Sequence, residues 1–95
     1  MNWREAVDAA EPDEKGRKIA IGWPEPRGEF PEVKAILSLE GEYRIGPFWS
    51  FFQEPEYFPP ERLQKMEENY CWVPSTEAEY WFLLGRLVES VYDNL

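Results

Sequence analysis

Carboxylates and aromatic rings are the side chains through which this sequence is best equipped to bind another molecule. The stretch GPFWSFFQEPEYFPPE, residues 46–61, holds six aromatic rings, four prolines and three glutamates in sixteen residues. Aromatic rings bind by burying large apolar areas and by cation–π contacts, and carboxylates attract cationic groups. This combination is typical of a binding surface for a basic protein or an organic cation.

Catalytic groups are scarce by comparison. The 95 residues include no histidine, so the serines lack an imidazole that could activate them. Cys71, the single cysteine, has no histidine beside it, and this favours a mostly buried, inert thiol next to the last helix. Sixteen glutamates make any chosen acid–base pair uninformative, and no phosphate loop, zinc spacing or EF-hand pattern is present. We therefore expect no enzymatic activity, no metal site and no cofactor.

The charge is strongly negative and unevenly distributed. The 19 acidic and 10 basic side chains give a net charge of −9. Residues 1–47 carry 10 acidic and 7 basic groups, a net −3, and residues 48–95 carry 9 and 3, a net −6. Such a field repels nucleic-acid phosphates and anionic lipid and attracts cationic partners. We expect a basic protein partner, with no direct nucleic-acid binding and no membrane contact, although the acids could instead serve only solubility.

Length and the N-terminal sequence place the chain in a broad class. A chain of 95 residues is expected to form a single domain over residues 1–95. Its apolar runs are far shorter than the roughly twenty residues of a membrane span. The acidic start MNWREAVDAAE does not resemble a signal peptide, and a lone cysteine is unusual for a small secreted domain. These features predict a cytoplasmic protein.

The first half of the chain predicts one helix and three strands. Asn2 and Glu5 form a capping-box pattern for a helix that ends before Pro12. Alternation in RKIAIGW predicts a half-buried strand over residues 17–23, and residues 32–52 predict a hairpin around a Glu40–Gly41 turn. One hairpin face is expected to carry the following side chains: Val33, Ala35, Leu37, Leu39, Tyr43, Ile45, Trp49 and Phe51.

The aromatic stretch itself should divide between core and surface. Gly46–Pro47 predicts a bulge or bend in the second hairpin strand, with Pro47 at an edge position. We expect Trp49 and Phe51 in the core. At least one further ring should be exposed or lie in an intersubunit contact, and the candidates are Phe52, Tyr57 and Phe58.

Two helices are expected in the second half, over residues 59–70 and 75–95. Thr76 and Glu79 suggest a capping box for the second of them. Its core stripe is expected to comprise Tyr80, Leu84, Leu87, Val88, Val91 and Leu95. Phe82 projects about 160° away from Leu84, among charged residues, and Gly85 suggests close approach by a neighbouring backbone or subunit. We expect Phe82 to belong to an intermolecular surface.

The predicted fold is a single α+β domain. It consists of an N-terminal helix, a small three-stranded, mainly antiparallel sheet and two C-terminal helices packed on one face.

Three functions from different classes fit these residues. The leading hypothesis is a non-enzymatic acidic protein that docks on a basic protein surface, as an inhibitor or phosphate mimic does. Its predicted partner-binding residues are Glu54, Glu56, Tyr57, Phe82, Glu89 and Asp93. An alternative is a small-molecule binder that holds an organic cation between Trp49, Phe52, Glu54 and Tyr57. A further alternative is a homodimer whose rings serve only its own interface.

Overall fold

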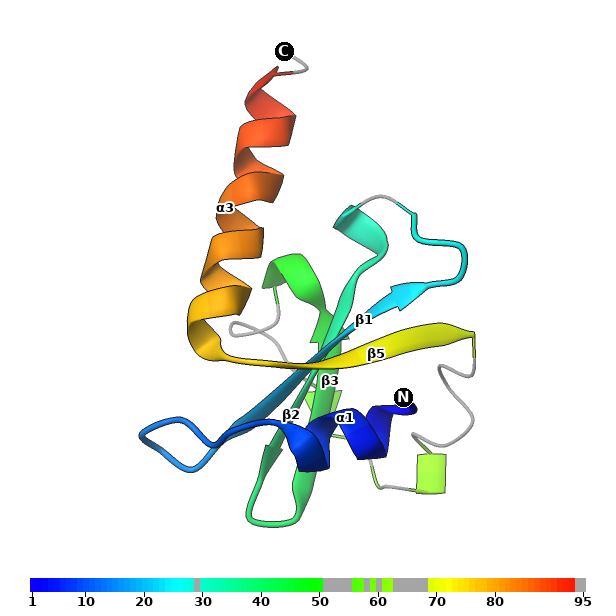
Figure 1. The fold of residues 1–95 in the computed structure, drawn as a ribbon, viewed down its shortest axis with the longest axis vertical. Coiled ribbons are helices and arrows are strands. Elements are labelled where there is room, and N and C mark those ends of the chain that lie inside the picture. The colour runs from blue at the N-terminus through cyan, green and yellow to red at the C-terminus, as the bar shows by residue number, and fades with distance from the viewer. Residues whose placement is uncertain (29, 51–55, 58, 60, 63–68, 94–95) are drawn as a thin grey trace.

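One antiparallel sheet organises the chain (Figure 1). The computed structural model describes residues 1–28, 30–50, 56–57, 59, 61–62 and 69–93. Within these ranges the sheet has five strands in the order β4-β3-β2-β1-β5. The strands are β1 (Lys18–Pro24), β2 (Lys34–Leu39), β3 (Glu42–Pro47), β4 (Glu56–Tyr57) and β5 (Tyr70–Ser75). The helical elements are α1 (Trp3–Ala9), α3 (Glu77–Asp93) and the 3-10 turns η1 (Phe30–Glu32) and η2 (Phe48–Ser50).

The α+β class and the antiparallel sheet are confirmed, but the predicted number of strands is wrong. Two strands were missed, namely the two-residue β4 and the six-residue β5. No strand is expected over YCWVPS from the sequence, because Tyr70 and Ser75 fall at the ends of the two helices predicted over residues 59–70 and 75–95, and the residues between them include a proline. Strand β5 pairs with β1 from Ile19↔Ser75 to Pro24↔Tyr70. Because β5 is an edge strand, Pro74 needs no ladder donor on its outer side.

Strand β1 is an interior strand of the sheet, and not the half-buried strand that its alternation predicts. It lies between β2 and β5. The four residues Ile19 to Gly22 are all buried, because both faces of β1 are covered. A strand covered on both sides has no polar face, so small residues such as Ala20 and Gly22 take the place of polar ones.

Helix α1 covers one face of the sheet. The predicted capping box is confirmed, since the Asn2 side chain accepts from the Glu5 N–H and Glu5 reaches back to the Asn2 backbone. The buried side chains of α1 are Trp3, Ala6 and Val7. They pack against the sheet residues Ala20, Ile36, Ile45 and Trp72.

Helix α3 contacts the opposite face, and the prediction that the two C-terminal helices share one face stays a prediction, because most of residues 59–70 lie outside the described residues. The second cluster joins Tyr80 of α3 to the sheet residues Ile19, Ile21 and Ala35 and to Val33 and Phe48. Alternation along β1 sends Ile19 and Ile21 to this side and Ala20 to the α1 side. α1 and the first half of α3 therefore contact opposite faces of the sheet.

The hairpin and its turn are confirmed, but the assignment of its faces is partly wrong. Glu40 and Gly41 have φ values of 52° and 84°, as a tight hairpin turn requires. A two-residue turn pairs Leu37 with Arg44 and Ile36 with Ile45. Residues directly opposite each other share a face, so Tyr43 and Ile45 lie with Ile36, against α1, and not with Val33, Ala35 and Leu37.

Strand β3 ends at Pro47, so its alternation does not continue to Phe48 and Trp49. Residues 48–50 form η2, whose first N–H, on Phe48, donates to the Val33 carbonyl at 2.8 Å. The turn directs Phe48 into the core, where it is fully buried, and leaves Trp49 55% exposed. Trp49 was predicted to be core because strand alternation was continued past Pro47. Phe51 lies outside the described residues.

The helix predicted over residues 59–70 is only partly testable. Glu61 and Arg62 are helical, and residues 63–68 lie outside the described residues. Tyr70 begins β5 and does not continue a helix, so the predicted helix end is wrong.

Candidate docking surface

Helix α3 begins at a cap that the sequence predicts. The Glu79 N–H donates to the Thr76 hydroxyl at 3.1 Å, and the two side chains lie 3.5 Å apart. The Tyr80 N–H donates to the Thr76 carbonyl at 3.0 Å, which closes the first helical turn. This cap fixes where the helix leaves the sheet.

The first half of α3 is attached to the body by Tyr80. This residue is 1% exposed, and its hydroxyl donates to the Phe48 carbonyl at 2.6 Å. The two rings also meet edge to face, with centroids 5.1 Å apart. Leu83, Leu84 and Leu87 pack against the same cluster and are half-buried. Leu87 is the last described α3 residue that belongs to this cluster.

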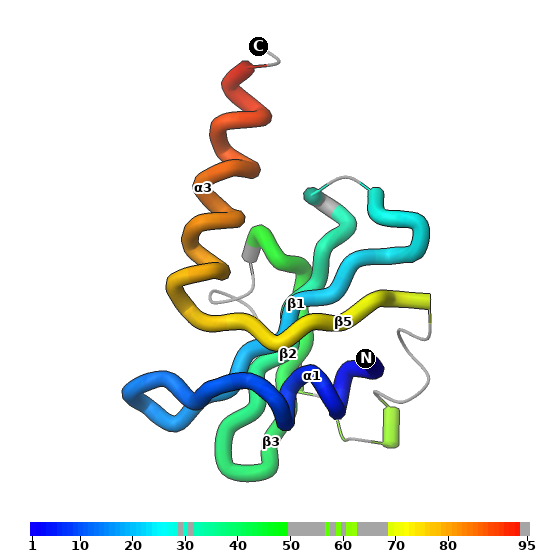
Figure 2. Tube along the Cα trace, viewed as in Figure 1, coloured from blue at the N-terminus to red at the C-terminus, as the bar shows by residue number. Residues whose placement is uncertain are grey.

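The second half of α3 extends beyond the sheet, as Figures 1 and 2 show. Val88 and Val91 were predicted to be core but are 48% and 56% exposed. A helix of 17 residues is about 25 Å long, and η2 and the sheet reach only its first half. The helical spacing of the predicted core stripe is correct, but among the described residues no element covers its C-terminal half. Leu95, the last predicted member, lies outside them.

Four residues form what we call the distal face of α3. At about 100° per residue they fall within an arc of roughly 60°. They are Trp81, Gly85, Val88 and Tyr92. Trp81 and Tyr92 are 50% and 68% exposed. Apart from the chain neighbours and the backbone of the helix itself, no atom of the described residues lies within 4 Å of the place where a Cβ on Gly85 would stand. Within the described part of the chain, no neighbouring backbone therefore approaches Gly85 closely, and approach by another subunit stays a prediction. Because glycine has no side chain, Gly85 leaves a shallow gap between the apolar side chains of Trp81 and Val88.

Beside the distal face lies what we call the acidic edge. It consists of the predicted residues Phe82, Glu89 and Asp93, which project within an arc of about 40°. Phe82 is 66% exposed, and Glu89 and Asp93 are exposed as well. The structure thus brings three of the predicted partner-binding residues together on one side of one helix. The intermolecular role of Phe82 stays a prediction.

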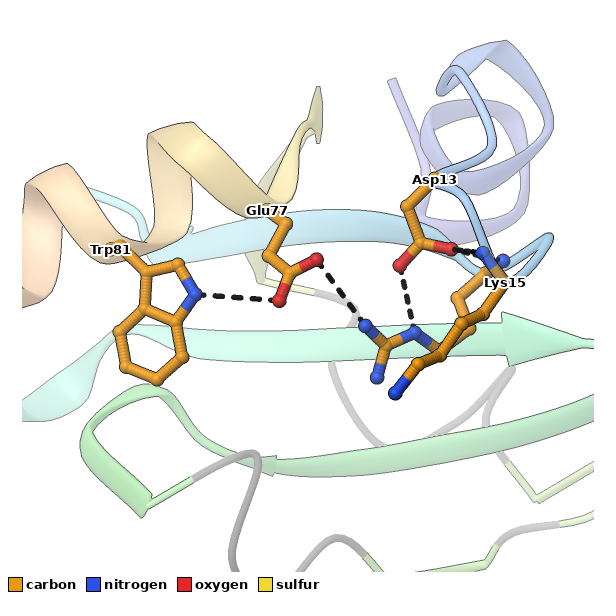
Figure 3. Close-up of polar contacts among 5 residues, drawn as sticks. Asp13, Lys15, Glu77 and Trp81 are labelled. Carbon is orange, nitrogen blue, oxygen red and sulfur yellow. Dashed lines mark hydrogen bonds and ion pairs between the residues drawn. The ribbon is translucent and has the colours of Figure 1, made fainter.

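The base of α3 is held by a polar network that sequence reasoning missed (Figure 3). Arg17 donates from Nε to the Asp13 carboxylate at 2.7 Å and from Nη2 to the Glu77 carboxylate at 3.3 Å. Glu77 also accepts from Trp81 Nε1 at 3.4 Å. Arg17 thereby connects the loop after α1 to the first turn of α3. The side chains are 60 residues apart in sequence, so no local spacing could have indicated the contact.

Asp13 is the titratable group that this network perturbs. Partial desolvation alone would raise the pKa of its carboxyl, but hydrogen bonds from Arg17 and from the Lys15 N–H outweigh this effect. The pKa of Asp13 is therefore lowered from the ordinary value of 3.8. Protonation of this carboxylate weakens the bonds that order the loop and hold Arg17 in position to bond Glu77 of α3.

We expect Asp13→Asn to remove part of the pH dependence of stability. Because the folded pKa lies below 3.8, the ionised carboxylate stabilises the fold above that pH, and the effect is lost as pH falls through the folded pKa. Urea midpoints measured between pH 2 and 7 should show wild type above the variant at neutral pH and the gap closing in acid. Asp8→Asn, an exposed carboxylate on α1, is the charge-matched control. A gap that is equally large at pH 2 and pH 7 would contradict the assignment.

A depression of about 610 Å³ lies beside this network. Its lining comes from the loop after α1 and the start of α3, and includes Asp13, Lys15, Arg17 and Glu77. With Glu14 the lining holds five charged side chains, and three of them, Asp13, Arg17 and Glu77, are joined by ion pairs. The depression therefore offers a ligand few uncommitted groups, and we do not place the function there.

The remaining predicted residues lie on other elements. Tyr57, on β4, is 53% exposed, and this fulfils the expectation that at least one late ring of the aromatic stretch is at the surface. Glu56 precedes it in the same strand and pairs with Ile45. Glu54 and Phe52 lie outside the described residues, so the predicted cation pocket around Trp49 stays a prediction.

Cys71 is half-buried, and not mostly buried as predicted. It lies in the edge strand β5, which has a neighbouring strand on one side only. In the described part of the chain, no three histidine, cysteine or acidic side chains gather closely enough to bind a metal ion. None of the helices described there combines the length and apolar character that crossing a membrane requires.

Sequence reasoning also missed Trp81 and Tyr92. The sequence did contain a sign that these side chains would be exposed. Around the helix axis, the apolar residues of α3 cover an arc of about 140° between the directions of Leu87 and Tyr92, which is wider than the arc that packs on a single sheet. A helix with so wide an apolar surface and only one sheet to cover it should leave part of that surface exposed.

Comparisons with protein-family models, with curated proteins and with solved structures each found no match to this chain.

Proposed function

We propose that this chain is a non-enzymatic interaction protein that docks through α3 on a basic surface of another protein. The observation that carries the proposal is the projecting half of α3. It exposes Val88, Val91 and Tyr92, and Tyr92 lies beside the carboxylates of Glu89 and Asp93. Exposed apolar side chains at the side of a charged edge are the usual composition of a protein interface.

The two kinds of side chain would act at different stages of binding. The net charge of −9 attracts a basic partner and raises the association rate, an effect that salt screens. Rings such as Tyr92 and Phe82, which are 68% and 66% exposed, would then supply the buried contacts that slow dissociation. A partner surface that ordinarily binds phosphate would be blocked by carboxylates held in this way, which is how an inhibitor or phosphate mimic works.

Site-specific photo-crosslinking in native host cells tests the proposal. A benzoylphenylalanine at Tyr92 should form a discrete adduct with another protein. The same group at Leu39, which is 37% exposed at the hairpin end away from α3, should not (Figure 1). The adduct should weaken when cells are lysed in high salt before irradiation. No adduct at Tyr92, or an adduct only with a second copy of this chain, would refute docking on another protein.

Phe82→Ala separates an anchor from a core residue. The ring is 66% exposed, so its removal should change the free energy of unfolding by less than about 1 kcal/mol. If Phe82 is an anchor, the same variant should weaken partner binding by about 2 kcal/mol or more, measured as loss of the Tyr92 adduct. A loss of stability of about 3 kcal/mol with unchanged crosslinking would show that the ring is core.

A further inference from the structure

We propose that the distal face of α3 receives an amphipathic helix whose apolar strip is bordered on one edge by lysine or arginine. This inference rests on the proposed function and specifies the partner. It follows from the shape of the distal face, from its length and from the position of the carboxylates beside it.

The shape of the distal face suits a helix. Trp81, Gly85, Val88 and Tyr92 follow one another at spacings of four, three and four residues. This is the spacing of a seam between two packed helices, in which a side chain of one helix enters a gap on the other. Gly85 provides such a gap between Trp81 and Val88, because the space above it is open. A large side chain of the partner can enter there, and the two backbones can approach closely.

The length of the face sets the length of the partner. Trp81 to Asp93 spans thirteen residues, which corresponds to about 18 Å along the helix axis. A partner segment of three to four helical turns would cover this distance. A shorter loop would leave Tyr92 or Trp81 uncovered.

The charges beside the distal face select a basic partner over a second copy of this chain. Glu89 and Asp93 border the face on the side of Phe82. If two copies paired in parallel, Glu89 and Asp93 of one copy would face the opposite, apolar edge of the other, which carries Leu84 and Val91 and offers no cation. If they paired antiparallel about the midpoint between Arg86 and Leu87, the acidic edges would meet, and Arg86 of each copy could approach only Glu89, while Asp93 would lie near the level of Glu79. Each copy also carries a net −9, so two copies repel each other, whereas a helix with a lysine or arginine edge is attracted.

Selection from a displayed library of helical peptides tests this chemistry directly. The peptides carry a fixed apolar strip, and their bordering positions vary among lysine, arginine, glutamate, glutamine and serine. The full-length protein is the bait. Selected peptides should be enriched in lysine and arginine on one edge, and their binding should weaken several-fold when salt is raised.

Val88→Asp and Ser90→Asp form a matched pair for this measurement. Both add one negative charge to the same turn of α3, but Val88 lies in the distal face and Ser90 projects about 170° from its centre. Val88→Asp should weaken the selected peptide at least tenfold relative to Ser90→Asp. Urea unfolding of both variants should show that each stays folded.

Three results would overturn the inference. They are failure to enrich any peptide, enrichment without excess lysine or arginine, and equal affinity of the two variants. A wild-type dimer in sedimentation experiments that Val88→Asp dissolves would assign the face to a second copy instead. If the Tyr92 adduct forms with another protein while the library selects neutral peptides, the proposed function stands and only the helical, basic partner is refuted.

Discussion

Tyr80→Ala should lower the free energy of unfolding by about 3 to 5 kcal/mol, the usual cost of removing a large buried ring. Tyr80 is 1% exposed and fills the space between the sheet and α3. Its ring contacts Phe48 edge to face, and its hydroxyl bonds the Phe48 carbonyl at 2.6 Å. A chain of 95 residues has a total stability of only about 5 to 14 kcal/mol, so this loss is a large fraction of it.

Tyr80→Phe divides this loss between ring and hydroxyl. The variant keeps the ring but leaves the Phe48 carbonyl without its donor, which should cost about 1 to 2 kcal/mol. Tyr92→Ala is the control, because Tyr92 is 68% exposed on the same helix and its removal should change stability by less than about 1 kcal/mol. Urea unfolding measures all three. Equal losses for Tyr80→Ala and Tyr92→Ala would mean that α3 does not pack on the sheet through Tyr80.

Local signals in the sequence predicted the parts of the fold that local interactions determine. The Asn2–Glu5 cap, the Glu40–Gly41 turn and the Thr76 cap each involve residues at most three positions apart, and all three are present. Tertiary pairing decided the elements that were wrong. β5 is a strand because β1 offers it an edge, and no pattern within YCWVPS indicates this partner.

Only part of the candidate docking surface could be predicted from the sequence. Periodicity placed Phe82, Glu89 and Asp93 on the polar side of α3, and all three are exposed. Periodicity also placed Val88 and Val91 in the core, because it identifies which face is apolar but not how far the covering layer extends. The helical periodicity was therefore correct, but it could not show that the distal face is exposed. Its exposure depends on where the sheet ends, which is a property of the whole fold.

Gly22 and Trp72 show how a single close contact can determine which residues a strand accepts. Gly22 in β1 pairs with Trp72 in β5. A Cβ on Gly22 would stand 2.6 Å from the Trp72 ring, much closer than ordinary van der Waals contact. The ring cannot easily move away, because Tyr70 stacks on it with centroids 5.8 Å apart and α1 packs over the same cluster. Among the described residues the indole nitrogen has no hydrogen-bond partner, so packing alone holds the ring.

Gly22→Ala should therefore lower the free energy of unfolding by about 1 to 3 kcal/mol, the usual cost of overpacking a core. Gly85→Ala is the matched control. Outside the local helix backbone and the chain neighbours, nothing described lies within 4 Å of its new methyl group, so alanine in mid-helix should stabilise the protein by about 0.5 to 1 kcal/mol. One glycine substitution is thus expected to destabilise the protein and the other to stabilise it.

A double-mutant cycle with Trp72→Leu identifies the cause of the Gly22 effect. Trp72→Leu alone should be strongly destabilising, because it leaves a cavity under α1. In that background the methyl group of Gly22→Ala enters vacated space, so the second substitution should cost at least about 1 kcal/mol less than it does in wild type. Urea unfolding of the four proteins gives this coupling energy. Additivity within about 0.5 kcal/mol would show that the cost comes from the backbone of β1, and that the Trp72 ring does not require glycine opposite it.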